Sequence, residues 1–189
     1  MAYDSGNRWA VRGGAVPQVD IDVGLRAYML RIYNYMASGL ALTGIVAYAA
    51  AASGFYHQIA GTPLIWVVML APLGLVFWLS AGIERMSAGT AQLIFWVYAG
   101  LMGLIGIIIA SLVNMFIASS ALQFAISVIG VLVFVGLTAW DTQSIKEMYV
   151  ASDDGQVAGK KSIMGALRLY LDFLNLFLML MQLFGQRRD

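Results

Sequence analysis

Two aspartates stand in apolar sequence where an acid is costly. Asp141 closes the run SALQFAISVIGVLVFVGLTAWDTQ, and Asp172 lies within LRLYLDFLNLFL. A carboxylate at membrane depth costs a few kcal/mol, so it is expected to face a partner, a water-filled cavity or a bundle interior. If the two carboxyl groups meet in a poorly solvated site, they would share a proton and titrate as a coupled pair. The protonated pair could latch two helices together, whereas the ionised pair would offer oxygen ligands for a transient Ca²⁺ ion.

Each aspartate also has a simpler interpretation. Arg168 lies four residues before Asp172 on the same helical face, so these two side chains could form a local ion pair. Asp141 stands where its apolar run ends, so it and the polar residues around it could simply hold a helix end at the membrane surface.

Other polar residues could support the pair. Arg85, in GIERMSAGTAQ, could neutralise part of its charge, although the adjacent Glu84 also allows an ion pair at the membrane surface. Asn175, three residues after Asp172, is the best candidate to line the same site. The remaining asparagines in apolar sequence, Asn34 and Asn114, are expected to form hydrogen bonds between helices.

The composition limits the class of protein. Of 189 residues, 61% are hydrophobic and 11% are charged, which indicates a membrane protein. The net charge of +1 gives no reason to expect a nucleic-acid partner. Cysteine is absent and His57 is the single histidine, so we expect neither a resident cofactor nor the usual metal sites. No serine is convincingly paired with His57 or with a lysine at membrane depth, so we do not expect an enzyme.

Five apolar segments are long enough to cross a bilayer as helices. They predict an all-α, polytopic membrane helix bundle at residues 27–52, 64–83, 91–117, 121–141 and 163–184. Residues 1–25 are predicted to be a mobile cytoplasmic tail, and residues 26–189 the membrane domain. The third segment would form a helix of about 40 Å, which must tilt, kink or project from the bilayer.

The distribution of basic residues predicts the orientation. With five crossings and a cytoplasmic N-terminus, most Lys and Arg residues fall on the cytoplasmic side, as is typical of membrane proteins. These are Arg8, Arg12, Arg26, Arg31, Arg85, Lys146, Lys160 and Lys161, whereas Arg187 and Arg188 fall on the other side. In this orientation Arg85, Asp141 and Asp172 all lie toward the cytoplasmic half and could meet.

Two motifs in this order resemble a known family. The helix end GLTAWDTQ and the final LYLDFLNLF are similar to those of bacterial members of the Bax inhibitor-1 (transmembrane Bax inhibitor motif) family. The resemblance implies a seven-helix fold with a central last helix, and a pH-sensitive calcium leak in the bacterial inner membrane. It also implies that Asp141 and Asp172 are the paired aspartates of the family and that Arg85 is the arginine that engages them.

The chain departs from that pattern in its third segment. AQLIFWVYAGLMG and LIGIIIASLVNMF, which belong to different helices in relatives, here abut at Gly103 and Leu104. We therefore predict an internal deletion of two crossings, so that relatives carry about 40 to 60 more residues at this junction. An incomplete wall around the last helix favours an alternative function as a non-conducting interaction protein that modulates a membrane-bound quality-control protease.

Overall fold

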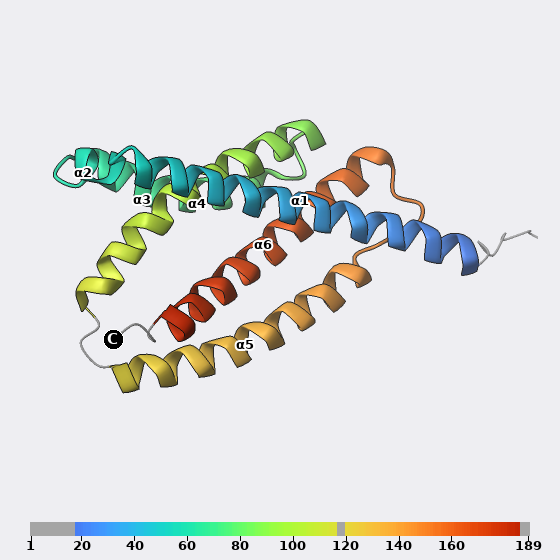
Figure 1. Cartoon of the computed structure of the whole chain (residues 1–189). Helices are drawn as coiled ribbons and strands as arrows, with labels where there is room; N and C mark the ends of the chain where they lie inside the picture. Colours follow the sequence, from blue (N-terminus) through green and yellow to red (C-terminus); the bar gives the residue numbers. More distant parts are fainter. Residues whose placement is uncertain (1–17, 117–119, 186–189) are drawn as a thin grey trace, which may run out of the picture.

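The computed structural model describes residues 18–116 and 120–185, where every regular element is a helix (Figure 1). The helices are α1 (Gln18–Ala52), α2 (Phe55–Ile59), α3 (Leu64–Gly82), α4 (Ala88–Phe116), α5 (Ser120–Glu147) and α6 (Gly155–Gly185). All of them except the short α2 are long and apolar enough to cross a membrane. The predicted all-α bundle with five membrane-spanning helices is therefore confirmed.

Several helices extend beyond the apolar segments that predicted them. α5 continues six residues past Asp141, and α6 begins at Gly155, eight residues before the predicted start. The Asp154 carboxylate caps α6 by accepting a hydrogen bond of 2.7 Å from the Val157 N–H. α1 begins at Gln18, so residues 18–25 of the expected tail are helical, and residues 1–17 lie outside the described residues. Apolar patterning marks the part of a helix that contacts lipid and does not locate its capped ends.

The first two membrane-spanning helices are joined by residues 53–63, which contain a turn and the short α2. α1 ends before Gly54, whose φ of 66° is a left-handed conformation that glycine adopts without strain. The short α2 follows, and Pro63 directly precedes α3, where its ring allows a helix to start.

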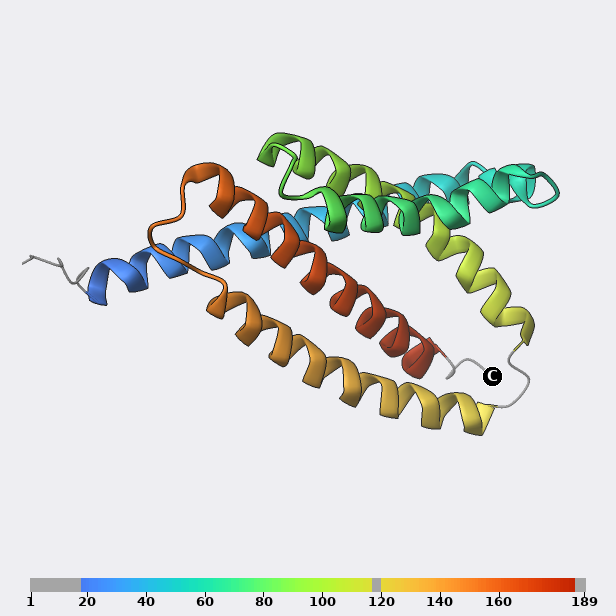
Figure 2. The same cartoon turned by 180° about the vertical axis from the view of Figure 1, so that it is seen from behind.

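The predicted junction lies inside one continuous helix. α4 has 29 residues, which corresponds to a length of about 43 Å. Its second half turns away from α1 and α3 in both views (Figures 1 and 2). At Gly103 the backbones of α1 and α4 come close, because an added Cβ atom would lie 2.5 Å from the Thr43 carbonyl oxygen. A Cβ atom at Gly100 or Gly106 would meet nothing within 4 Å, so only one of the three glycines makes this contact.

The main core lies between α1, α4 and α6. Tyr170 of α6 is fully buried and packs edge-on against Phe95 and Tyr98 of α4, with ring centroids 5.9 Å apart in each pair. The buried Thr43 hydroxyl of α1 lies 2.8 Å from the Ala99 carbonyl oxygen and 2.6 Å from the Tyr170 hydroxyl. These contacts fix the first half of α6 against α1 and α4.

The second half of α6 is packed much less tightly. No residue from 171 to 184 is fully buried, and the described side chains of α5 include only two buried ones, Ser127 and Ile145. α5 and α6 diverge from α1 and α3 toward this end, whereas the second half of α4 turns toward them (Figures 1 and 2). α3 and α4 are held together there by a separate cluster that includes Val68, Ile105 and Ile108. α5 therefore depends mainly on α6 for its packing.

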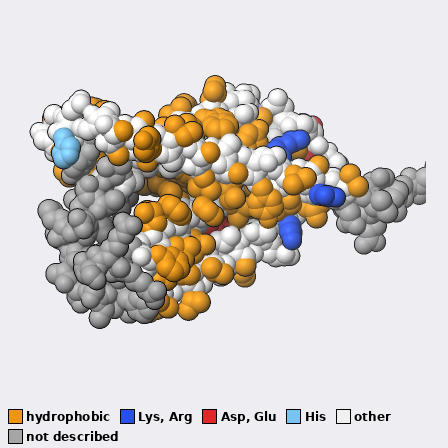
Figure 3. Space-filling model, in the orientation of Figure 1, with side chains coloured by type: hydrophobic (Ala, Val, Ile, Leu, Met, Phe, Trp, Pro, Cys, Tyr) orange, Lys and Arg blue, Asp and Glu red, His pale blue; other side chains and the backbone are white. Residues whose placement is uncertain are grey.

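The surface is apolar except at one end. Hydrophobic side chains are spread over the face of the molecule in Figure 3, and Lys and Arg side chains gather toward the end from which α1 starts. This arrangement suits a protein whose flanks contact lipid and whose basic end meets the charged surface of a membrane.

Candidate functional site

The structure brings Asp141 and Asp172 together between α5 and α6. Both side chains are partly buried, and their carboxyl groups lie within hydrogen-bonding range of each other. The two helices form an antiparallel hairpin joined by residues 148–154. The same register runs along the hairpin, because Gly130 lies against Met179 and Ile145 lies against Gly165. A regular hairpin is therefore sufficient to place the two aspartates opposite each other.

One oxygen of this pair has no ordinary hydrogen-bond donor. Oδ2 of Asp172 is buried, and no N–H or O–H group among the described residues bonds to it. Two ionised carboxylates are acceptors only, so neither can donate a hydrogen bond to the other. A proton held by one carboxyl group would turn their contact into a hydrogen bond. The arrangement can therefore hold one proton between two helices.

The nearby polar side chains do not bind the pair. The Thr142 hydroxyl donates to the Thr138 carbonyl oxygen at 2.7 Å, and the Gln143 amide donates to the Glu147 carboxylate at 3.3 Å. Both bonds lie within α5. Because α5 continues to Glu147, Asp141 does not mark a helix end.

Neither predicted arginine forms an ion pair with the aspartates. Among the side chains that the structure describes, the one salt bridge is Lys161–Asp153, with an N–O distance of 2.6 Å. The alternative of a local Arg168–Asp172 pair is therefore wrong for this structure, since Arg168 is exposed and lines a different hollow. Arg85 is exposed in the turn between α3 and α4. That turn accepts a hydrogen bond from Lys160, and Asp172 lies twelve residues, or about 18 Å, farther along α6.

The pair can supply only part of a calcium shell. No group of three or more His, Cys, Asp or Glu side chains within the described ranges could hold a metal ion. Ca²⁺ takes six to eight oxygen ligands, so two carboxylates would bind it weakly, with water completing the shell. Asn175 lies one turn beyond Asp172 and is partly buried, whereas the Asn114 side chain lies outside the described part of the chain.

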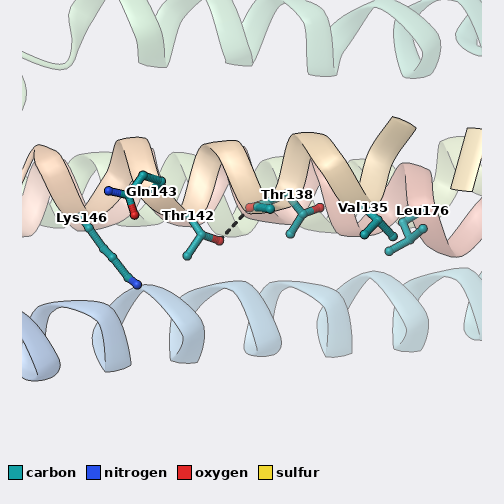
Figure 4. A pocket seen from close by; sticks show the side chains of 7 residues that line it. Val135, Thr138, Thr142, Gln143, Lys146 and Leu176 are labelled. Carbon is teal, nitrogen blue, oxygen red and sulfur yellow. Dashed lines mark hydrogen bonds between the residues drawn. The ribbon is translucent and has the colours of Figure 1, made fainter. Parts of the chain in front are cut away.

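A shallow depression of about 450 Å³ lies beside the pair on α5. Its walls are Val135, Thr138, Ala139, Thr142, Gln143 and Lys146 of α5 together with Leu176 of α6. Thr142 and Lys146 point toward α1, the blue helix in Figure 4. Neither aspartate lines this depression. Thr138, Thr142 and Lys146 follow one another at intervals of four residues, so the sequence alone indicates that they share one helical face.

A comparison with known families supports the resemblance that the two motifs indicated. The family model described as "Inhibitor of apoptosis-promoting Bax1" matches residues 25–105 and 101–189, which is most of the chain. This chain belongs to the Bax inhibitor-1 family. The resemblance predicted from the sequence is therefore confirmed.

Three relatives of this family member illustrate the similarity. An uncharacterized protein of Rickettsia prowazekii (strain Madrid E) is 42% identical over 89% of this chain and 93% of its own length. Inner membrane protein YbhL of Escherichia coli (strain K12) is 37% identical over 87% of this chain and 94% of its own. An uncharacterized membrane protein of Streptococcus pyogenes serotype M3 is 31% identical over 87% of this chain and 95% of its own length. No solved structure matches the chain. These names and the five apolar helices identify this family member as a multi-pass membrane protein.

The same alignments show that this family member lacks an internal segment that its relatives contain. The family match is in two pieces that meet at residues 101–105, which include the predicted junction at Gly103 and Leu104. The alignment to the Rickettsia protein spans 219 positions but covers 89% of 189 residues, about 168, so about 51 positions have no residue here. This gap agrees with the predicted loss of two crossings.

Proposed function

We propose that this protein is a pH-sensitive calcium leak of the bacterial inner membrane, with its basic end in the cytoplasm and a gate formed by Asp141 and Asp172. The observation that supports it is the buried Oδ2 of Asp172, which has no donor but lies beside a second carboxyl group. A proton on the pair would join α5 to α6 and close the gate. Release of that proton would open it.

The energy available to the gate comes from charge repulsion. Two carboxylates about 4 Å apart repel each other by about 4 kcal/mol at an effective dielectric constant of 20. α5 resists this repulsion weakly, because among its described side chains only Ser127 and Ile145 are buried. α6, in contrast, is held by Tyr170 against α1 and α4. We therefore expect α5 to move while α6 stays in place.

The ionised pair would also favour the passage of Ca²⁺. Carboxylate oxygens are the ligands that this ion prefers, and two of them form an incomplete shell. Conduction requires binding that is strong enough for entry and weak enough for exit. A two-carboxylate site with water as the remaining ligand meets both requirements.

Calcium flux into dye-loaded liposomes between pH 6 and pH 8 tests this function. We expect flux through the wild-type chain to rise with pH, and the Asp141→Asn and Asp172→Asn chains to lose that dependence. Glu147→Gln is the matched control, because it removes an exposed acid at the end of the same helix. If Glu147→Gln abolished the pH dependence as fully as the two Asn variants, the pair would not be the gate.

One observation favours the alternative function. The α5 side chains Leu132 and Trp140 are 69% and 76% exposed, and this chain lacks about 51 positions of its relatives. An uncovered apolar helix could bind another membrane protein, such as a membrane-bound quality-control protease. Absence of flux from a folded, inserted chain, together with co-purification of a protease that is lost when Trp140 is changed to Ala, would favour this function.

A further inference from the structure

A second hollow, which we call the basic hollow, lies near the start of α6. It has a volume of about 430 Å³, and its wall includes Glu84 of the α3–α4 turn and Lys160, Lys161 and Arg168 of α6. The sulfur-containing side chains of Met148 and Met164 form part of its apolar wall. The hollow therefore combines three cations with an apolar surface on one side of α6.

The three cations of the basic hollow differ in what already binds them. Lys161 is neutralised by Asp153, whose Oδ2 lies 2.6 Å from its Nζ atom. Lys160 donates to the backbone oxygen of Glu84 at 2.9 Å, so no carboxylate balances its charge. Arg168 is exposed, and the structure shows no hydrogen bond or ion pair for it among the described side chains. Neither Lys160 nor Arg168 forms a salt bridge with a described carboxylate, although Glu84 lines the same hollow.

The position of Arg168 calls for an anionic partner. It lies 13 residues into α6, inside the segment that is apolar enough to span a membrane. An arginine at this depth is costly unless it reaches an anion or the headgroup layer. Its planar guanidinium binds phosphate oxygens in a two-pronged manner, and the flexible lysine adds a second charge.

We propose that the basic hollow binds a phosphate group, held by Arg168 and Lys160. The phosphate of an anionic phospholipid fits the wall best, because basic pockets between membrane helices bind such headgroups and the adaptable methionines can contact an acyl chain. A soluble phosphate compound shares the recognised chemistry but makes no use of the methionines. This site is separate from the aspartate pair, and its test involves no ion flux.

Native mass spectrometry of the full chain in detergent, titrated with phosphatidylglycerol, tests the proposal. Each surface cation contributes about 1 kcal/mol to anionic lipid binding, so we expect Arg168→Gln and Lys160→Gln each to weaken binding about fivefold. Lys146→Gln is the matched control, since it removes an exposed lysine at the end of α5, outside the basic hollow. This control should change binding less than about twofold.

Competition with inorganic phosphate identifies the source of the phosphate. If millimolar phosphate leaves wild-type lipid binding unchanged, the site is a lipid site; if it displaces the lipid from wild type but not from Arg168→Gln, a soluble phosphate compound is the ligand. Equal weakening by all three variants would mean unspecific surface attraction and would overturn the proposal. Unchanged binding in both Arg168→Gln and Lys160→Gln, with helical circular dichroism retained, would overturn it as well.

Discussion

The hydroxyl groups of Thr43 on α1 and Tyr170 on α6 lie 2.6 Å apart in the core of the bundle. Thr43 also contacts the Ala99 carbonyl oxygen of α4, so one threonine joins three helices. Tyr170 precedes Asp172 by two residues, a spacing that turns the two side chains to different sides of α6. One side of α6 is therefore bound to α1 and α4, and another side meets α5 through the aspartates.

Removal of the Tyr170 hydroxyl should weaken the contact between α1 and α6 without leaving a large cavity. We expect Tyr170→Phe to lower the free energy of unfolding by about 1 kcal/mol, because one buried hydrogen bond is lost while the ring remains. Thermal unfolding in detergent measures the change. Tyr48→Phe, at a site on α1 that is 78% exposed, is the control and should have no effect. Equal midpoints for the two variants would mean that the Thr43–Tyr170 contact does not stabilise the bundle.

Gly103 should tolerate no larger side chain. A Cβ atom there would lie 2.5 Å from the Thr43 carbonyl oxygen and 3.0 Å from the Val46 Cβ atom, so α1 would have to move. We expect Gly103→Ala to destabilise the chain by about 1 to 3 kcal/mol, as overpacking does. Gly100→Ala, where nothing lies within 4 Å, should be neutral or slightly stabilising. A thermal midpoint for Gly103→Ala at or above that of Gly100→Ala would contradict the close packing of α1 and α4.

Gly103 also lies at the junction where this chain lacks the internal segment of its relatives. Gly103 lies where the two pieces of the family match meet, and α4 is continuous through it. The two joined parts therefore form one continuous helix, and the glycine at the junction allows α1 and α4 to approach closely.

The proposed gate predicts movement of α5 with pH. The chain has no cysteine, so spin labels can be attached to cysteines introduced at the exposed positions Leu132 on α5 and Phe177 on α6. We expect the distance between these labels, measured by pulsed electron resonance in liposomes, to increase from pH 6 to pH 8. The same pair in an Asp172→Asn chain should show no change, because an asparagine carries no charge at either pH.

A second label pair separates movement of α5 from general loosening. Labels at the exposed positions Leu93 on α4 and Phe173 on α6 report on the distance between these two helices, which Tyr170 holds together by packing against Tyr98. Their distance should stay constant between pH 6 and pH 8. If this distance changed as much as the α5–α6 distance, the whole bundle would respond to pH and α5 would not be the moving part.

Local patterns in the sequence were sufficient for the helices, whereas the pairing of the aspartates was implied by the family resemblance. Five apolar segments predicted five helices, and the predicted orientation placed Asp141 and Asp172 in the same half of the membrane, where they could meet. The failure of Arg85 and Arg168 to pair with the aspartates was not predictable, because it depends on where the α3–α4 turn lies against α6. The Thr43–Tyr170 bond was missed for a similar reason. Its partners are 127 residues apart, and no spacing rule connects them.

Calcium flux in liposomes that contain the Asp172→Asn chain, measured at pH 6 and pH 8 beside the wild-type and Glu147→Gln chains, tests the central claim most directly. The proposed gate predicts a wild-type flux that rises with pH, the same rise for Glu147→Gln, and equal flux at both pH values for Asp172→Asn. An Asp172→Asn flux that rises with pH as the wild-type flux does, or no flux from any folded and inserted chain, would contradict it.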